Sequence, residues 1–172
     1  FYIEKKDKDK ITRFDNNIVS TKFANNVYFE GYFETEKYFT DIKDLILNEF
    51  TFIDHEKYIK SPYISLLNNS NSVSICLRQN RFSEGKNYVD NVINSKKSAI
   101  FTKEQIIYIN KAIGYFKNKI DKPIFFLWSN DYKSIDLRLF DEEVVMVVHD
   151  EKFLSTIDKR CLDLFLISNC KN

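Results

Sequence analysis

The chain has 172 residues and a mass of 20.5 kDa, of which 44% are hydrophobic and 16% aromatic. That apolar content is enough for a packed core and excludes disordered and fibrous classes, and the length suits one domain or one and a half. Lys and Arg number 26 against 25 Asp and Glu, giving a net charge of +1 without a long block of like charge. A nucleic-acid partner is therefore not expected.

The glycines and histidines exclude several common catalytic motifs. The three glycines, Gly31, Gly85 and Gly114, lie too far apart for G-x-G-x-x-G or a Walker A loop, which need closely spaced glycines around a phosphate. The two histidines, His55 and His149, are also distant from each other, so neither H-E-x-x-H nor a histidine-rich metal site is present. Zinc-dependent hydrolysis is therefore not expected.

The cysteines and the chain start bear on the compartment. Cys76, Cys161 and Cys170 are odd in number and show no C-x-x-C spacing, which is typical of reduced thiols in a cytosolic protein. No apolar stretch reaches the roughly 18 residues of a membrane span, and no signal peptide is recognisable. The first residue is Phe1 rather than Met, so we expect the true start to lie upstream.

The first third of the chain shows little periodicity. Residues 1–27 are polar and predict loop and short strand, whereas apolar residues at helical spacing from Tyr38 to Phe50 predict a helix of about three turns. Ser61-Pro62 predicts a turn. The Asn and Ser cluster at 68–72 predicts a linker that precedes a new unit.

Strand and helix patterns alternate in the rest of the chain. Residues 73–77, 124–128 and 144–148 are short apolar runs that suit buried strands. Thr102-Lys103-Glu104-Gln105 reads as a capping box that begins a helix with its apolar stripe at Ile106, Ile109, Ile113 and Phe116. A short helical stretch before Phe140 and an amphipathic helix through residues 157–168 complete a βαβαβα pattern. This pattern predicts a parallel sheet with flanking helices.

Polar residues follow each predicted strand, where open parallel sheets bind their ligands. They are Arg78 after the first strand, Ser129, Asn130 and Asp131 after the second, and His149 and Asp150 after the third. An arginine beside several hydrogen-bonding groups suits a phosphorylated or sugar-nucleotide ligand. Polar residues also occur at such edges without a ligand, and residues 129–131 could equally cap the next helix.

Four stretches of the chain, EGYFETEKYF, SVSICLR, IFFLWSND and DLFLISNCK, resemble motifs of glycosyltransferase family 11, the α-1,2-fucosyltransferases. Residues 30–39, EGYFETEKYF, are similar to the family's E-G-Y-W-Q-S-E-K-Y-F, and residues 72–78, SVSICLR, stand where the family has S-V-S-I-H-I-R-R-G-D-Y. Residues 124–131, IFFLWSND, resemble F-F-I-F-S-D-D, and residues 163–171, DLFLISNCK, resemble D-L-Y-L-M-S-x-C-K. Order and spacing agree from Val27 onward.

The resemblance implies a GT-B-like fold of two Rossmann-type halves facing a cleft. The family's G-N-Q loop and its S-F-S-W-W segment are absent, so we expect an internal fragment lacking both ends. Residues 1–60 would be the end of the first, acceptor-side half with a connecting helix. Residues 61–172 would be most of the second, nucleotide-sugar-binding half, truncated at its C-terminus.

The second stretch departs from the family pattern after its first arginine. Cys76 replaces the family's His, and Gln79, Asn80, Arg81 and Phe82 replace its Arg, Gly, Asp and Tyr. Arg78 alone is retained, and the resemblance implies that it holds the donor's pyrophosphate and neutralises charge on the leaving nucleoside diphosphate. Arg81 is the candidate for a second positive charge.

By resemblance, the reaction is inverting, metal-independent transfer of L-fucose from GDP-fucose to the 2-hydroxyl of a galactose-type acceptor in surface polysaccharide synthesis. Glu36, with Glu30, is the candidate general base, although a glutamate at a helix start also interacts favourably with the helix dipole. Asn130 and Asp131 are candidates for nucleoside contacts. His149 is either a ligand contact or an exposed loop residue, whereas Cys76 and Trp128 are expected in the core.

The expected partners are a nucleotide-sugar donor and a glycan acceptor. Because the acceptor could be lipid-linked, we expect a cytoplasmic location, with peripheral association at the inner face of a bacterial membrane. Two alternatives remain open: an inactive sugar-nucleotide-binding remnant, or a structural α/β interaction module whose family likeness reflects ancestry alone.

Overall fold

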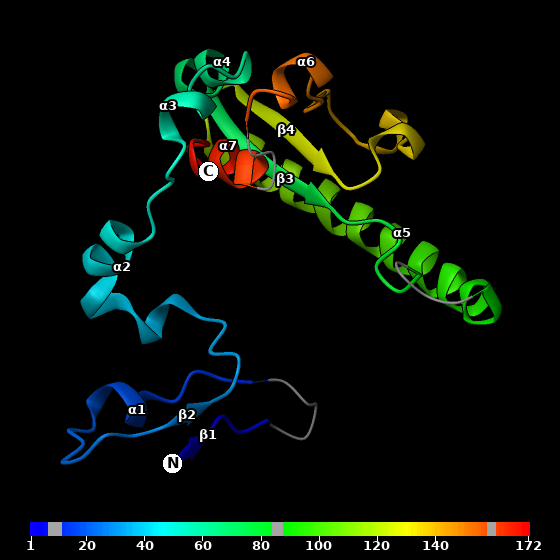
Figure 1. Cartoon of the computed structure of the whole chain (residues 1–172). Helices are drawn as coiled ribbons and strands as arrows, with labels where there is room; N and C mark the ends of the chain where they lie inside the picture. Colours follow the sequence, from blue (N-terminus) through cyan, green and yellow to red (C-terminus); the bar gives the residue numbers. More distant parts are fainter. Residues whose placement is uncertain (7–11, 84–87, 158–160) are drawn as a thin grey trace. The chain divides into compact units, whose positions relative to one another are not determined.

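A computed structural model describes residues 1–6, 12–83, 88–157 and 161–172 of the chain (Figure 1). The chain divides into two compact units, Phe1–Thr51 and Phe52–Asn172. The division lies nine residues before the predicted boundary at residue 60. The assignment of the units to acceptor-side and nucleotide-side halves stays a prediction.

The first unit contains little regular structure. Strands β1 (Tyr2–Ile3) and β2 (Phe29–Glu30) form a two-residue parallel pair, and the helical segments are α1 (Asn16–Ser20), η1 (Glu36–Tyr38), η2 (Thr40–Ile42) and α2 (Lys43–Glu49). The helix predicted from Tyr38 to Phe50 is thus two 3₁₀ turns followed by α2. Phe39 and Ile42, with φ of −122° and −118° and ψ near zero, interrupt the helical backbone between these pieces.

The second unit is built on a parallel sheet, as the sequence predicts. Strands β3 (Asn71–Leu77), β4 (Pro123–Ser129) and β5 (Val144–Met146) lie in the order β3-β4-β5. Val73 is in register with Phe125, and Phe125 with Val144. These strands are continuous apolar runs because helices and loops cover both faces of the sheet, so side chains that point to either face lie against protein.

The helices of the second unit are α3 (His55–Tyr58), α4 (Tyr63–Asn69), α5 (Tyr88–Lys119), α6 (Glu151–Leu154) and α7 (Leu162–Ser168). The connection from β4 to β5 carries only the 3₁₀ turns η3 (Tyr132–Ser134) and η4 (Leu137–Leu139). The helix predicted through residues 157–168 corresponds to α7, which begins at Leu162, whereas α6 lies before the predicted range. Residues 158–160, which belong to that prediction, lie outside the described residues.

Two predicted boundaries in this unit are wrong. The capping box at Thr102 does not begin a helix, because α5 already begins at Tyr88 and no Gly or Pro between them would stop it. The Asn and Ser cluster at 68–72 is not a linker, because α4 ends at Asn69 and β3 begins at Asn71. Ser72 is buried there and donates its hydroxyl hydrogen to the Leu67 carbonyl oxygen at 3.0 Å.

The sheet has a hydrophobic cluster on each face. One face packs on α5 and on the segment between β4 and β5, through Val73, Ile75, Leu77, Ile109, Ile113, Phe125, Leu127, Phe140 and Val144. The other packs on α3, α4 and α7, through Tyr58, Leu67, Phe126, Trp128, Val147, Leu162, Phe165 and Leu166. Trp128 is 5% exposed, so its expected place in the core is confirmed.

The backbone also pairs on the outer side of β3. The Ser74 N–H donates to the Asn172 carbonyl oxygen at 2.9 Å, and the Asn172 N–H donates to the Ser72 carbonyl oxygen at 3.1 Å, which is the parallel ladder pattern. The chain therefore passes from β3 to β4 and β5 along one face, and returns along the other face, by α6 and α7, to the far side of β3. Such a reversal is a topological switch point, beside which open α/β sheets bind ligands.

Candidate functional site

The carboxyl ends of β3 and β4 are joined by direct hydrogen bonds. The side-chain amide of Asn130 accepts from the Gln79 N–H at 2.7 Å and donates to the Gln79 carbonyl oxygen at 3.0 Å. The structure therefore brings Asn130 to the segment that follows β3, as the parallel topology predicts. Both hydrogen-bonding atoms of this side chain face the protein backbone.

Gln79, which sequence analysis noted only as a departure from the family pattern, lies at the centre of this edge. Its Oε1 accepts from the Ser129 hydroxyl at 2.9 Å, and its Nε2 donates to the Ser134 hydroxyl oxygen at 2.8 Å. Ser134 in turn donates to Asp131 Oδ2 at 2.8 Å, and the Asp131 N–H donates to Ser129 Oγ at 3.2 Å. The predicted residues 129–131 thus share one network.

Arg78 leaves β3 between this network and helix α5. Its N–H donates to Gln105 Oε1 at 3.3 Å, and its carbonyl oxygen accepts from Gln105 Nε2 at 2.8 Å. The residue itself is exposed. A charged side chain on a backbone held at the carboxyl end of β3 is the arrangement expected for an anion-binding arginine at a switch point.

The residues after Gln79 turn sharply. Asn80 has a φ of 53°, in the left-handed region that glycine adopts freely and that asparagine tolerates better than most residues. The family motif has glycine at this position, the residue that adopts this conformation most freely. The guanidinium of Arg81 lies 5.0 Å from the Phe101 ring centroid and 5.9 Å from that of Phe82. Its part in donor binding stays a prediction.

His149 is neither an exposed loop residue nor an isolated one. Its side chain is 13% exposed, and its Nε2 lies 2.7 Å from Oδ1 of Asp163 in the first turn of α7. The Tyr63 ring packs edge-on against the imidazole at 6.0 Å. Nδ1 is buried and has no hydrogen-bond partner within the described parts of the chain. Sequence analysis did not predict this pair, although Asp163 begins the family-like stretch DLFLISNCK and was for that reason a candidate.

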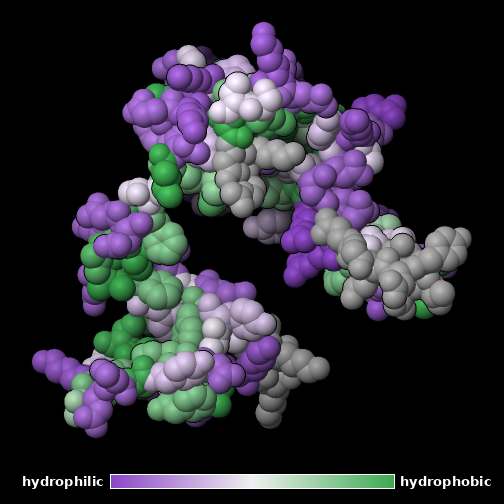
Figure 2. All heavy atoms as spheres, in the orientation of Figure 1, coloured by the Kyte–Doolittle hydropathy of each residue, from purple (hydrophilic) through white to green (hydrophobic). Residues whose placement is uncertain are grey.

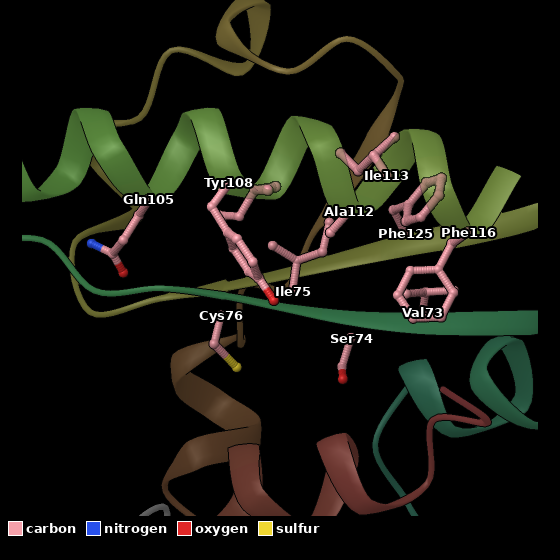
Figure 3. A pocket seen from close by; sticks show the side chains of 11 residues that line it. Val73, Ser74, Ile75, Cys76, Gln105, Tyr108, Ala112, Ile113, Phe116 and Phe125 are labelled. Atoms are coloured by element: carbon pink, nitrogen blue, oxygen red, sulfur yellow. The ribbon is translucent and has the colours of Figure 1, made fainter. Parts of the chain in front are cut away.

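Cys76 is exposed, so its expected place in the core is wrong: its face of β3 is buried at Ser72 but becomes exposed toward the end of the strand. The side chain faces away from α5, toward the side of the sheet that α7 covers (Figure 3). Partial burial of the thiol raises the pKa of Cys76, and the Asp163 carboxylate raises it further. Burial also raises the pKa of Cys170 to about 11. These thiols are therefore protonated at neutral pH, and Cys76, Cys161 and Cys170 are all free. The structure thus gives no sign of an activated cysteine nucleophile at this edge.

A cavity of about 360 Å³ lies between α5 and the outer part of β3 (Figure 3). Its wall is mainly apolar, and Gln105 and Tyr108 bring polar groups to it from α5. Figure 3 shows the Tyr108 side chain extending from α5 down to β3. Because Gln105 both lines the cavity and binds the Arg78 backbone, the cavity adjoins the predicted anion site.

The candidate base Glu36 belongs to the first unit, whereas Arg78 belongs to the second. Glu36 is exposed at the start of η1, where Thr35 Oγ1 caps the turn by accepting from the Lys37 N–H at 3.4 Å. Glu30 is exposed in β2. Both positions allow contact with a solute, and the catalytic role of Glu36 stays a prediction.

The EGYF segment of the first unit folds around another carboxylate. Glu4 Oε2 accepts from the Tyr32 N–H at 2.8 Å and from the Phe33 N–H at 3.2 Å. A side chain at Gly31 would bring its Cβ within 2.4 Å of Glu4 Cβ, so the glycine is required by close approach.

Figure 2 shows hydrophobic side chains at the surface of this unit, where the exposed residues include Tyr28, Tyr32, Leu45, Leu47 and Phe50.

The described residues also bear on the expectations about a metal and a membrane. Within residues 1–6, 12–83, 88–157 and 161–172, no group of three His, Cys, Asp or Glu side chains is placed to hold a metal ion. The helices of the described segments include none that is both long and apolar enough to cross a bilayer. That the reaction needs no metal, and that the protein associates with a membrane, both stay predictions.

Comparison with known proteins decides the family. The model of "Glycosyl transferase family 11" matches residues 2–172. The chain belongs to glycosyltransferase family 11. The resemblance seen in residues 30–39, 72–78 and 163–171 is thereby confirmed. No solved structure matches the family 11 chain significantly.

A curated relative of this family 11 chain is an alpha-1,2-colitosyltransferase of Escherichia coli. The two are 26% identical over 163 residues, which are 92% of this chain and 52% of the relative. The chain thus spans about half the length of the curated relative it matches.

Proposed function

We propose that this family 11 chain serves the inverting transfer of L-fucose from GDP-fucose to the 2-hydroxyl of a galactose-type acceptor, without a metal, in surface polysaccharide synthesis. The observation that carries the proposal is the family match over residues 2–172. The position of Arg78 after β3, at the switch point of a parallel sheet, supports it. The wider expectations, a GT-B-like fold and a cytoplasmic, peripherally membrane-associated protein, belong to the same proposal.

Arg78 has the central role in this mechanism. Its guanidinium binds the donor's two phosphates and stabilises the negative charge that develops on the leaving GDP as the glycosidic bond breaks. Arg81, Ser129, Asn130 and Asp131 are the further donor-site residues. Glu36 is the base that accepts the proton of the acceptor hydroxyl as its oxygen attacks the anomeric carbon.

A second donor has a specific observation in its favour. The relative is named for colitose, which is L-fucose without its 3-hydroxyl, and its name carries the same α-1,2 linkage. A site for either donor has the same requirement for a cation at the diphosphate. GDP-colitose is therefore the alternative donor.

Binding and transfer by the 172-residue chain test the proposal. Calorimetric titration is expected to show GDP binding and much weaker UDP binding, and GDP release with either donor and lactose would show transfer. Arg78→Ala should lower binding or turnover more than a hundredfold, about 2.7 kcal/mol, because it removes the charge on the phosphates. Arg138→Ala is the matched control, since it removes an exposed arginine from η4, where Arg138 pairs with Asp136 at 2.8 Å.

The outcomes separate the three function classes. Binding and transfer support the glycosyltransferase. GDP binding without transfer supports the sugar-nucleotide-binding remnant, and absence of guanine-nucleotide binding supports the structural interaction module. A normal GDP affinity in Arg78→Ala would contradict the role of Arg78.

A further inference from the structure

Two consecutive residues after β3 are each bracketed by a side-chain amide. Gln105 of α5 pairs with both the N–H and the carbonyl oxygen of Arg78, at 3.3 and 2.8 Å. Asn130, at the end of β4, pairs with both backbone groups of Gln79, at 2.7 and 3.0 Å. A primary amide carries the same donor and acceptor as a peptide group, so each bracket reproduces a pair of strand hydrogen bonds.

The two brackets continue the hydrogen-bonding pattern of β3, with the same alternation of sides from one residue to the next. The backbone groups of Ser72 and Ser74 bond outward, to Asn172, while those of Val73 between them point toward β4. Because backbone groups point to opposite sides at successive residues of a strand, Arg78 should bond outward and Gln79 toward β4. The structure shows this alternation, with Gln105 on the outer side and Asn130 on the side of β4.

The brackets also coincide with the end of the extended backbone. The next residue, Asn80, has a φ of 53°, so the chain turns directly after Gln79. Gln79 is held a second time by its side chain, between Ser129 and Ser134. The backbone of Arg78 is thus held by β3 before it, by the hydrogen-bonded Gln79 after it and by the Gln105 amide beside it. This fixes the direction in which its Cα–Cβ bond leaves the chain.

We propose that Gln105 and Asn130 are positioning residues for Arg78, which hold its backbone so that the guanidinium meets the donor diphosphate without a prior ordering step. This rests on the proposed function, because it assigns Arg78 a diphosphate ligand. Preordering of a binding group raises affinity by removing the entropy cost of fixing it during binding. It also gives Asn130, predicted as a nucleoside contact, a role through the backbone.

The test is GDP affinity in two bracket variants and a matched control. Gln105→Met and Asn130→Leu keep the side-chain volume but remove the amide, and each is expected to weaken GDP binding about tenfold. Asn110→Leu is the control, because Asn110 also lies on α5 and its amide also binds loop backbone, at Leu139 and Asp141. Asn110→Leu should lower the melting temperature yet leave GDP affinity within about twofold of the wild type.

A double-mutant cycle provides a readout that a purely structural role would not move. If Gln105 acts through Arg78, then Gln105→Met should cause no further loss of GDP affinity in the Arg78→Ala background. Full loss in both backgrounds would overturn the positioning role. The positioning role would also be overturned if Gln105→Met and Asn130→Leu bound GDP as tightly as the control Asn110→Leu does.

The wild-type chain supplies a measurement that needs no variant to fold. In NMR hydrogen exchange, the amide hydrogens of Arg78 and Gln79 should be protected at least a hundredfold relative to the unfolded chain, because both are bonded in the brackets. Unprotected exchange at both residues would overturn the inference. If the wild type does not bind GDP, the proposed function fails and the positioning role with it. If Arg78→Ala loses binding but the bracket variants do not, the positioning role alone fails.

Discussion

His149 Nε2 lies 2.7 Å from Asp163 Oδ1, which joins the segment after β5 to the first turn of α7. This contact holds the chain at the place where it leaves the sheet and crosses to the opposite face. The imidazole is 13% exposed and the carboxylate 59%, so the pair is partly shielded from solvent. It ties a family-like motif on α7 to the edge of the sheet that carries the proposed site.

Asp163→Ala should destabilise the second unit by about 1 kcal/mol, because it leaves a largely buried imidazole without its partner. Urea unfolding followed by tryptophan fluorescence measures this, since Trp128 lies in the core of that unit. Glu104→Ala is the control, as it removes an exposed carboxylate from α5. Equal stability of the two variants would show that the pair contributes nothing.

A different substitution at Asp163 should alter the chemistry of Cys76. Burial is the main reason that the pKa of Cys76 is raised, and the negative charge of Asp163 adds to it. Asp163→Asn removes the charge, so the pKa of Cys76 should fall and its alkylation by iodoacetamide at pH 8 should be faster. Peptide mass spectrometry gives the rate. Alkylation of Cys161, on the same chain, provides the internal control and should be unchanged.

Stability should fall in alkaline solution through Cys170. Burial raises its pKa to about 11 in the folded chain, whereas an unfolded cysteine has a pKa of about 8.5. Between these values the unfolded chain binds fewer protons than the folded one, so the free energy of unfolding decreases as pH rises. Urea unfolding at pH 8 and pH 10 measures the decrease. It should be smaller in Cys170→Ala, and an equal decrease in that variant would contradict the assignment.

Alanine at two glycines should have opposite effects. Gly31→Ala places a Cβ 2.4 Å from Glu4 Cβ, and we expect a loss of about 1–3 kcal/mol in the first unit. Gly114→Ala meets no atom within 4 Å on the exposed side of α5, and helix propensity should stabilise the second unit by about 0.5–1 kcal/mol. Hydrogen exchange resolved by residue assigns each change to its unit. Effects of the same sign would refute the account of close approach at Gly31.

Substitutions at Asn80 should follow its φ of 53°. Asn80→Gly restores the residue of the family motif and should be neutral or stabilising by up to about 1 kcal/mol, whereas Asn80→Val should cost about 1–2 kcal/mol. The Ser83 N–H and hydroxyl both donate to the backbone carbonyl oxygen of Asn80, so a change of the Asn80 side chain does not remove these hydrogen bonds. Thermal unfolding measures both. A valine variant as stable as the wild type would contradict the left-handed turn.

The sheet could be predicted from sequence because its signals are local. Three short apolar runs identify β3, β4 and β5, and alternation with helices predicts parallel pairing. The placement of Ser129, Asn130 and Asp131 beside the segment after Arg78 follows from that topology alone. The Cys76 to Phe82 departures were also visible, although their structural meaning was not.

Helix boundaries were less predictable, since capping patterns have meaning only where the preceding backbone is not helical. Thr102 has the residue types of a helix start but lies within α5, and the cluster at 68–72 has those of a loop but lies between α4 and β3. In both places, the structure that local composition predicts is not the one that forms. In the first, helix continues from Tyr88 without a breaker, and in the second, packing buries Ser72.

By itself, the sequence determined the family, the parallel α/β architecture and the identity of the candidate arginine. Those features are encoded in short motifs and in the period of apolar residues, which neighbouring residues along the chain specify. The tertiary structure alone decided that amides of Gln105 and Asn130 bracket the backbone around Arg78, and that His149 meets Asp163. Such contacts join residues 14 to 51 positions apart, and their hydrogen-bond geometry exists only once helices and strands have packed.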